Sequence, residues 1–138
     1  NYLAVVAAAI ANMAIGFLWY GPLFGKTWAG LMDFKFDSPE EMREMKKKMM
    51  PGYIASFVAA LIMAYVLAHA MIFASTYLNA SGVTAGLMGG FWNWFGFVVP
   101  VTVGVVFWEP KPWKLWFINA GYWLVTLLVM WGTLSLWK

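Results

Sequence analysis

The sequence predicts an all-α membrane protein whose four transmembrane helices form one bundle of two antiparallel hairpins. Of the 138 residues, 63% are hydrophobic and only 11% are charged, and the mean hydropathy is +0.71. Soluble domains carry about a quarter charged residues and under half apolar ones. The charges also cluster in short connectors between long apolar tracts. That distribution is typical of a membrane protein with several spans.

Four apolar tracts are long enough to cross a bilayer, at about 2–25, 52–75, 84–108 and 113–137. Each has 24 or 25 residues. As a helix, each would extend roughly 36 Å, against a hydrocarbon core of about 30 Å. Helices are expected because open strands leave backbone groups unpaired in lipid. We therefore interpret residues 1–138 as a single four-span membrane domain.

The first connector, 26–51, predicts a short amphipathic helix. Ser38 can cap its start, Pro39 suits the first helical position, and Glu41 completes a capping box. We expect Pro51 to end this helix before the second span begins. A helix lying on the membrane surface and a solvated arm explain the pattern equally well.

The basic residues predict the orientation of the chain. Eight of the nine Lys and Arg residues lie in or beside the first and third connectors, and only Lys138 lies on the opposite side. The positive-inside rule therefore predicts that both connectors are cytoplasmic and both termini outside, in the inner membrane. The third connector, Glu109–Pro112, is a tight turn that predicts antiparallel packing of the last two spans.

Composition also excludes several classes of function. The chain has no cysteine and one histidine, and no carboxylate lies inside a span, so it lacks the ligands that zinc prefers. No catalytic set or phosphate-binding loop is present, and we expect neither enzyme activity nor a cofactor or metal. Basic residues beside membrane spans indicate topology and contacts with anionic lipid, so we expect no nucleic-acid partner.

Polar side chains inside spans are the usual candidates for function in a membrane. The four that we single out are Asn12, His69, Asn93 and Asn119. His69 is the one such group that titrates near neutral pH. A hydrogen bond between helices is the commoner role for a lone histidine, and a proton relay is the alternative. Because no acid or base lies deep in a span, proton-coupled antiport is disfavoured.

Small residues recur at every fourth position in three spans and allow helices to approach closely. The packing candidates are Gly16, Ala60, Ala64, Gly86 and Gly90. They would either line a seam between copies of the chain or pack the bundle internally, and internal packing is favoured.

The third span contains a proline that disturbs a helix, and the fourth span carries several bulky tryptophans. Pro100 cannot donate to the carbonyl of Gly96, so we expect a kink in the third span. The fourth span carries Trp116, Trp123 and Trp131. We expect it to face lipid or a partner along much of its length.

Three motifs carry a resemblance to a known family. They are Trp19-Tyr20-x-Pro22-x-Phe24-Gly25-Lys26-x-Trp28, Trp94-Phe95-Gly96-Phe97-x2-Pro100 and Asn119-Ala120-Gly121-Tyr122-Trp123. Together they resemble a small prokaryotic integral membrane family classed as domain of unknown function 1761, over nearly the whole chain. The resemblance implies a four-span inner-membrane protein in which segments 19–28 and 119–123 are shared features. It supplies no activity.

We therefore expect a non-enzymatic membrane protein that forms a homo-oligomer or serves as an accessory subunit of a membrane complex. Its expected partners are membrane lipids and either itself or another membrane protein. The alternative is a small transporter or channel whose path is lined by the four polar candidates, which should then converge on a water-accessible cavity. A third hypothesis is a lipid-binding module that uses Lys46, Lys47 and Lys48.

Overall fold

The structure is a computed structural model that describes residues 1–32 and 38–137, and all regular structure in these ranges is helical. Four helical stretches are long and apolar enough to cross a membrane: Tyr2–Leu23, Pro39–Leu78, Gly82–Trp108 and Trp113–Leu136. The predicted all-α class with four spans is confirmed.

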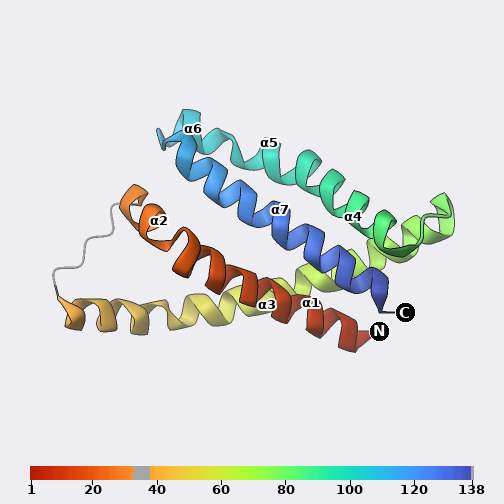
Figure 1. Cartoon of the computed structure of the whole chain (residues 1–138), viewed down its shortest axis with the longest axis horizontal. Coiled ribbons are helices and arrows are strands. Elements are labelled where there is room, and N and C mark those ends of the chain that lie inside the picture. The colour runs from red at the N-terminus through yellow and green to blue at the C-terminus, as the bar shows by residue number, and fades with distance from the viewer. Residues whose placement is uncertain (33–37, 138) are drawn as a thin grey trace.

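The four spans form a bundle in which α7 lies between α1 and α4 (Figure 1). Helix α1 (Tyr2–Leu18) also packs against α3 (Pro39–Leu78), and α4 (Gly82–Asn93) runs antiparallel to α7 (Trp113–Leu136). Both termini lie at one end of the bundle, and the first and third connectors lie at the other (Figure 1).

Helix α7 is the most buried of the four spans, which corrects the expectation that it faces lipid or a partner. In the most apolar 18-residue stretch of α7, 39% of the residues are buried. In the corresponding stretch of the span Gly82–Trp108, only 6% are buried. Trp116 is 8% exposed and Trp131 is 4% exposed, while Trp123 is half-buried. The expectation was wrong because Gly89 of α4 leaves room for the Trp131 ring, which a Cβ at that position would meet at 2.6 Å. Trp116 is covered from the third span, where its Nε1 donates to the Thr102 hydroxyl at 3.0 Å.

Helix α3 begins as predicted, but it does not end at Pro51. The Ser38 hydroxyl accepts a hydrogen bond from the Glu41 backbone N–H at 3.3 Å. The helix then runs without interruption for 40 residues. Because Pro51 has no backbone N–H, only the carbonyl of Lys47 lacks its usual helical hydrogen bond. Both residues are exposed. The predicted separate amphipathic helix is therefore the first part of α3.

The first connector also contains a helix that the sequence did not predict. It is α2 (Gly25–Leu31), which follows α1 after one irregular turn. At its other end, α3 stops at Asn79, whose φ of 52° is left-handed. Asparagine tolerates this conformation better than most residues.

Two π-helical turns interrupt the first and third spans. The first, η1 (Trp19–Leu23), contains Pro22 and closes with a hydrogen bond of 2.9 Å from the Phe24 N–H to the Trp19 carbonyl. The second, η2 (Trp94–Val98), ends two residues before Pro100.

Short helices α5 (Val99–Thr102) and α6 (Gly104–Trp108) complete the third span. The predicted departure from regular α-helix at Pro100 thus takes the form of a π turn before it and a break after Thr102. The Thr102 hydroxyl donates to the Val98 carbonyl at 2.6 Å, as expected near a proline that disturbs the backbone ladder.

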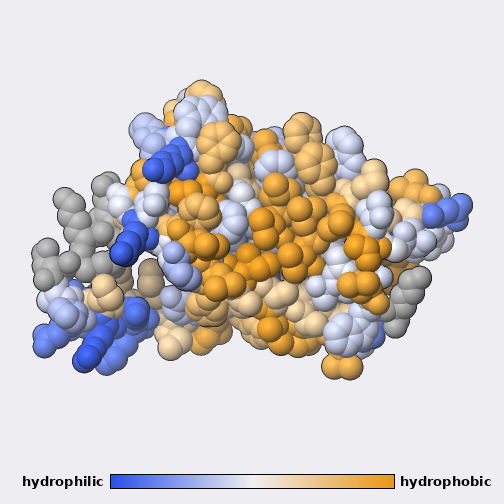
Figure 2. All heavy atoms as spheres, in the orientation of Figure 1, coloured by the Kyte–Doolittle hydropathy of each residue, from blue (hydrophilic) through white to orange (hydrophobic). Residues whose placement is uncertain are grey.

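The surface matches the division into apolar spans and charged connectors. Figure 2 shows a broad hydrophobic band across the middle of the visible face. Strongly hydrophilic residues gather at the end where α3 begins. The band is the part of the molecule that the hydrocarbon core of a bilayer would cover.

Candidate functional site

Two tyrosines and two asparagines from the first and last spans form a hydrogen-bonded group. The Tyr20 hydroxyl donates to Asn119 Oδ1 at 2.7 Å, and the Tyr122 hydroxyl donates to Asn12 Oδ1 at 2.7 Å. The two phenol rings meet edge to face, with centroids 5.1 Å apart. We call Asn12, Tyr20, Asn119 and Tyr122 the Tyr–Asn cluster. Its bonds join residues about 100 positions apart, so it fixes α1 and η1 against α7.

Two indole N–H groups donate to backbone carbonyls of the same turn of α7. Trp19 Nε1 donates to the Ile118 carbonyl at 2.9 Å, and Trp94 Nε1 donates to the Ala120 carbonyl at 2.7 Å. A helical carbonyl has a second lone pair, so these bonds add to the backbone ladder of α7. The first and third spans are thereby held to residues 118–122 from both sides.

Each of the two π turns supplies one of these indoles. Trp19 opens η1 and Trp94 opens η2. A π turn accommodates an extra residue and so changes the direction in which the following side chains point. The backbone irregularities thus lie where both spans contact the 118–122 turn.

Three glycines allow the close approaches on which the cluster depends. A Cβ on Gly25 would lie 2.6 Å from the Tyr20 carbonyl oxygen, and one on Gly121 would lie 3.1 Å from the Trp19 ring. A Cβ on Gly16 would lie 3.3 Å from the Tyr122 hydroxyl. Gly25 is the most restrictive position because a backbone atom, which cannot rotate away, faces it.

The first family-like motif folds back against the last one. Trp28 of α2 meets the Tyr20 ring edge to face at a centroid distance of 5.3 Å. Phe24 meets the Trp19 ring at 4.8 Å. Two other motif residues, Pro22 and Lys26, are exposed. The motif is therefore mainly a packing unit that places Trp19 and Tyr20 on α7.

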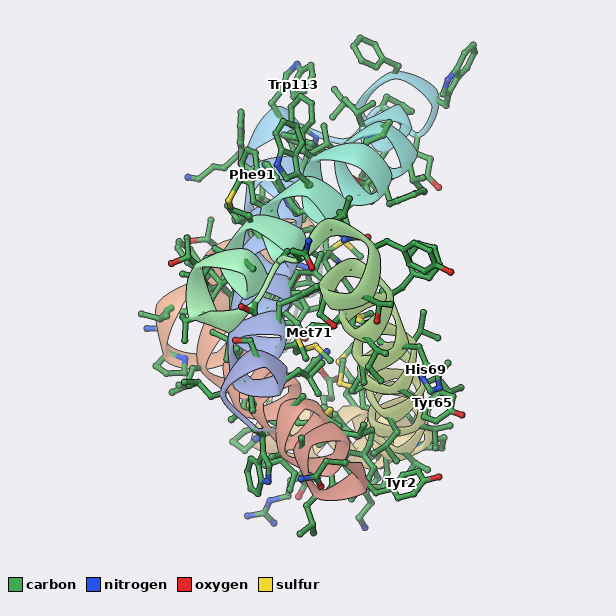
Figure 3. All side chains as sticks on the ribbon, turned by 90° about the vertical axis from the view of Figure 1, so that its right-hand side faces the viewer. Tyr2, Tyr65, His69, Met71, Phe91 and Trp113 are labelled. Atoms are coloured by element: carbon green, nitrogen blue, oxygen red, sulfur yellow. The ribbon has the colours of Figure 1, made fainter. Side chains whose placement is uncertain are left out.

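The structure brings together two of the four polar candidates. Asn12 and Asn119 both belong to the Tyr–Asn cluster. The exposed His69 bonds to the Tyr65 carbonyl of its own helix at 2.9 Å, and both side chains point away from the bundle (Figure 3). Asn93 donates to the Gly89 carbonyl of its own helix at 2.8 Å. The four side chains do not converge on one path.

The small residues of α4 lie directly against α7. An added Cβ would lie 2.9 Å from the Trp131 carbonyl oxygen at Gly86 and 2.9 Å from the Leu127 carbonyl oxygen at Gly90. Ala60 and Ala64 of α3 are also buried, at 1% and 0% exposure. These positions pack the bundle internally.

The chemistry of the Tyr–Asn cluster is that of a structural junction. Both hydroxyls and both indole N–H groups donate to acceptors within the bundle. Asn12 Nδ2 also donates to the Met130 sulfur at 3.7 Å. Among residues 1–32 and 38–137, no three His, Asp or Glu side chains are grouped so that they could hold a metal ion.

A helical bundle with four apolar spans defines an integral membrane protein of the multi-pass class. The model of the family described as Protein of unknown function (DUF1761) matches residues 3–135, so this chain belongs to that family. No curated protein and no solved structure matches the chain.

Sequence reasoning missed the central place of Tyr122 and Trp94. Tyr122 follows Asn119 by three residues, a spacing that places both on one side of a helix. Trp94 precedes Pro100 by six residues, so the proline marks the irregular region but not the indole itself. Neither signal identifies the partner, because both partners lie on other spans.

Proposed function

We propose that this protein is a non-enzymatic structural component of a membrane that assembles with a second copy of itself. Its buried polar groups join its own helices, which supports a structural role and disfavours a transport path. The observation that carries the proposal is an exposed face of small residues on α3. We call it the small-residue face, and it comprises Gly52, Ala55, Ser56 and Ala59.

The small-residue face is a suitable helix–helix contact. Its members repeat at intervals of three and four residues, so they share one side of α3. All four are exposed, and nothing lies within 4 Å of a Cβ added at Gly52. Because lipid tails are as apolar as side chains, helices in a bilayer associate mainly where small residues permit close backbone contact.

A second copy of the chain is the occupant that fits this face best. A twofold dimer needs a patch that is complementary to itself. Two identical small-residue helices meet this need because each offers both a shallow groove and a low ridge. The corresponding glycines of α4 already contact α7, whereas the small-residue face of α3 is covered by none of the residues that the structure describes.

Cysteine crosslinking in membranes tests this proposal, because the chain has no cysteine of its own. Ser56→Cys should form a disulfide-linked dimer on mild oxidation, since close helices bring Cα atoms within the roughly 4.4–6.8 Å that a disulfide needs. Val58→Cys is the matched control, because Val58 is 49% exposed at nearly the same depth on another side of α3. Equal crosslinking of both variants, or of neither, would contradict the proposed face.

We further propose that the first and third connectors are cytoplasmic and both termini outside, in an inner membrane. The support is that these connectors carry eight of the nine basic residues. Two of the nine, Lys35 and Lys138, lie outside the residues that the structure describes. On intact cells, an impermeant maleimide should label Ser81→Cys and not Glu109→Cys. The reverse pattern would overturn the orientation.

A further inference from the structure

The first part of α3 carries three consecutive lysines just before its apolar part begins. We call Lys46, Lys47 and Lys48 the basic turn. All three are exposed, and none forms an ion pair with a residue that the structure describes. Strongly hydrophilic residues gather at this end of the molecule (Figure 2). The basic turn is therefore a positively charged surface that is open to a partner of opposite charge.

The continuity of α3 sets the depth of the basic turn in a membrane. Helix α3 runs for 40 residues from Pro39 to Leu78, which is about 60 Å, or about twice the hydrocarbon thickness of a bilayer. Residues 49–78 contain no Asp, Glu, Lys or Arg, so the apolar part of α3 begins directly after Lys48. Lys48 precedes Gly52 by four residues, or about 6 Å, and a headgroup layer is about 5–8 Å deep. The basic turn thus lies at the level of the lipid phosphates.

The acidic residues of the same segment lie farther from the hydrocarbon than the lysines. Glu40 and Glu41 occupy the first turn of α3, about two helical turns before Lys48. Glu44 lies one turn before Lys48. Anionic lipids attract basic side chains within a Debye length of about 8–10 Å from the membrane surface. The order of charges along α3 therefore places the bases where that attraction acts and the acids beyond them.

We propose that the basic turn binds the headgroups of anionic phospholipids, and that this lipid permits two copies of the chain to associate. The second part of this inference rests on the proposed dimer. Lys48 lies four residues before Gly52 and eight before Ser56, so it continues the small-residue face toward the headgroups. In a twofold dimer of equally oriented copies, residues at the same depth meet. The two Lys48 ammonium groups then face one another, and a phosphate between them accepts a charge-assisted hydrogen bond from each.

The headgroup must carry a net negative charge, because two facing ammonium groups repel. Packed helices have axes about 8–10 Å apart, and at that distance the repulsion beside a membrane is only partly screened. A zwitterionic headgroup has its own cation beside the phosphate and leaves the net charge unchanged. Lys46 and Lys47 point to other sides of α3, since successive residues are about 100° apart. They contact the lipids that surround each copy.

Native mass spectrometry tests the first part of the inference. The protein is taken from nanodiscs of phosphatidylglycerol and phosphatidylcholine with identical acyl chains. The wild type should retain phosphatidylglycerol over phosphatidylcholine, and joint replacement of Lys46, Lys47 and Lys48 by Gln should reduce this preference at least about five-fold. Joint Lys111→Gln and Lys114→Gln is the control, because it removes charge from the other connector at the same end. Equal preferences in both variants would overturn the basic turn as the site.

Förster transfer between copies labelled at Ser81→Cys tests the second part. In phosphatidylcholine vesicles, replacing a third of the lipid by phosphatidylglycerol should strengthen dimerisation about ten-fold. Lys48→Gln should dimerise equally in both lipids, and more strongly than the wild type in phosphatidylcholine alone. Lys47→Gln is the matched control, because it removes the same charge at nearly the same depth from another side of α3. It should retain most of the lipid dependence, and inorganic phosphate at equal ionic strength should not replace the lipid.

The outcomes separate this inference from the proposed dimer. Absence of transfer in both lipids would overturn the dimer and the role of lipid in it, while retention of phosphatidylglycerol would still decide the first part. Equal dimerisation of the wild type in both lipids would overturn the role of lipid and leave the dimer intact. Weaker dimerisation of Lys48→Gln in phosphatidylcholine would overturn it too, because Lys48 would then pair with Glu44 of the second copy. An equal effect of inorganic phosphate would overturn the lipid as the source of the anion.

Discussion

The glycines of α4 that contact α7 and the small-residue face of α3 occupy opposite environments in this molecule. Gly86 and Gly90 of α4 lie so close to α7 that an added Cβ would be 2.9 Å from its backbone, whereas Gly52 of α3 has nothing within 4 Å. Both sets belong to apolar spans surrounded by the same lipid. Because lipid is as apolar as the side chains, close backbone approach determines which faces are covered. Small residues left uncovered are therefore available for a partner.

The largest effect should follow from filling the contact between α4 and α7. Gly90→Leu would place its side chain against the Leu127 backbone, which cannot rotate away. We expect a loss of about 3 kcal/mol or more in the free energy of unfolding, at the upper end of overpacking effects. Gly96→Leu is the control on the same span, because Gly96 is exposed with open space around it. Denaturant titration in mild detergent that gave equal losses for both variants would contradict the packing account.

A smaller effect should follow at Gly25, where a close approach supports the Tyr–Asn cluster. Gly25→Ala would bring its Cβ to 2.6 Å from the Tyr20 carbonyl oxygen and should cost about 1–3 kcal/mol. Gly30→Ala on the same helix meets nothing within 4 Å and should be neutral or slightly stabilising. Thermal unfolding of both variants checks the difference, and a neutral Gly25→Ala would contradict it.

The smallest effect should come from removing a single hydroxyl of the Tyr–Asn cluster. Tyr122→Phe loses the hydrogen bond to Asn12 Oδ1, and we expect a cost of about 1 kcal/mol. A double-mutant cycle with Asn12→Ala should show positive coupling between the two residues. Tyr77→Phe, at a residue 70% exposed, should leave the free energy of unfolding unchanged. Additive losses in the cycle would show that the bond contributes nothing.

Much of the fold could be predicted because membrane spans have strong signals. Apolar length identified the four spans, and the Ser38 cap with Pro39 identified where α3 begins. The continuity of α3 through Pro51 could not be predicted, since a proline weakens a helix without always ending it. The central place of α7 was also missed. A span that is apolar on all sides does not reveal from hydropathy which side is buried.

The sequence identified several residues of the candidate site, but not which of them bond to one another. The sequence singled out Asn12 and Asn119 as polar groups inside spans, and Tyr20 as part of a motif. It did not predict that Tyr20 reaches Asn119, because these residues are 99 positions apart and helical periodicity describes only near neighbours. His69 was selected for its titratable ring, but a side chain on the outer face of α3 has no partner span.

The oligomeric state tests the central proposal most directly, because it asks whether the uncovered small residues of α3 are used. Mass measurement in lipid nanodiscs should show the wild type as a dimer, at twice the 15.6 kDa of one chain. Ala59→Leu, which fills the small-residue face, should be a monomer that still unfolds cooperatively, and Val58→Leu should remain a dimer. A monomeric wild type, or an Ala59→Leu variant as dimeric as the wild type, would contradict the account.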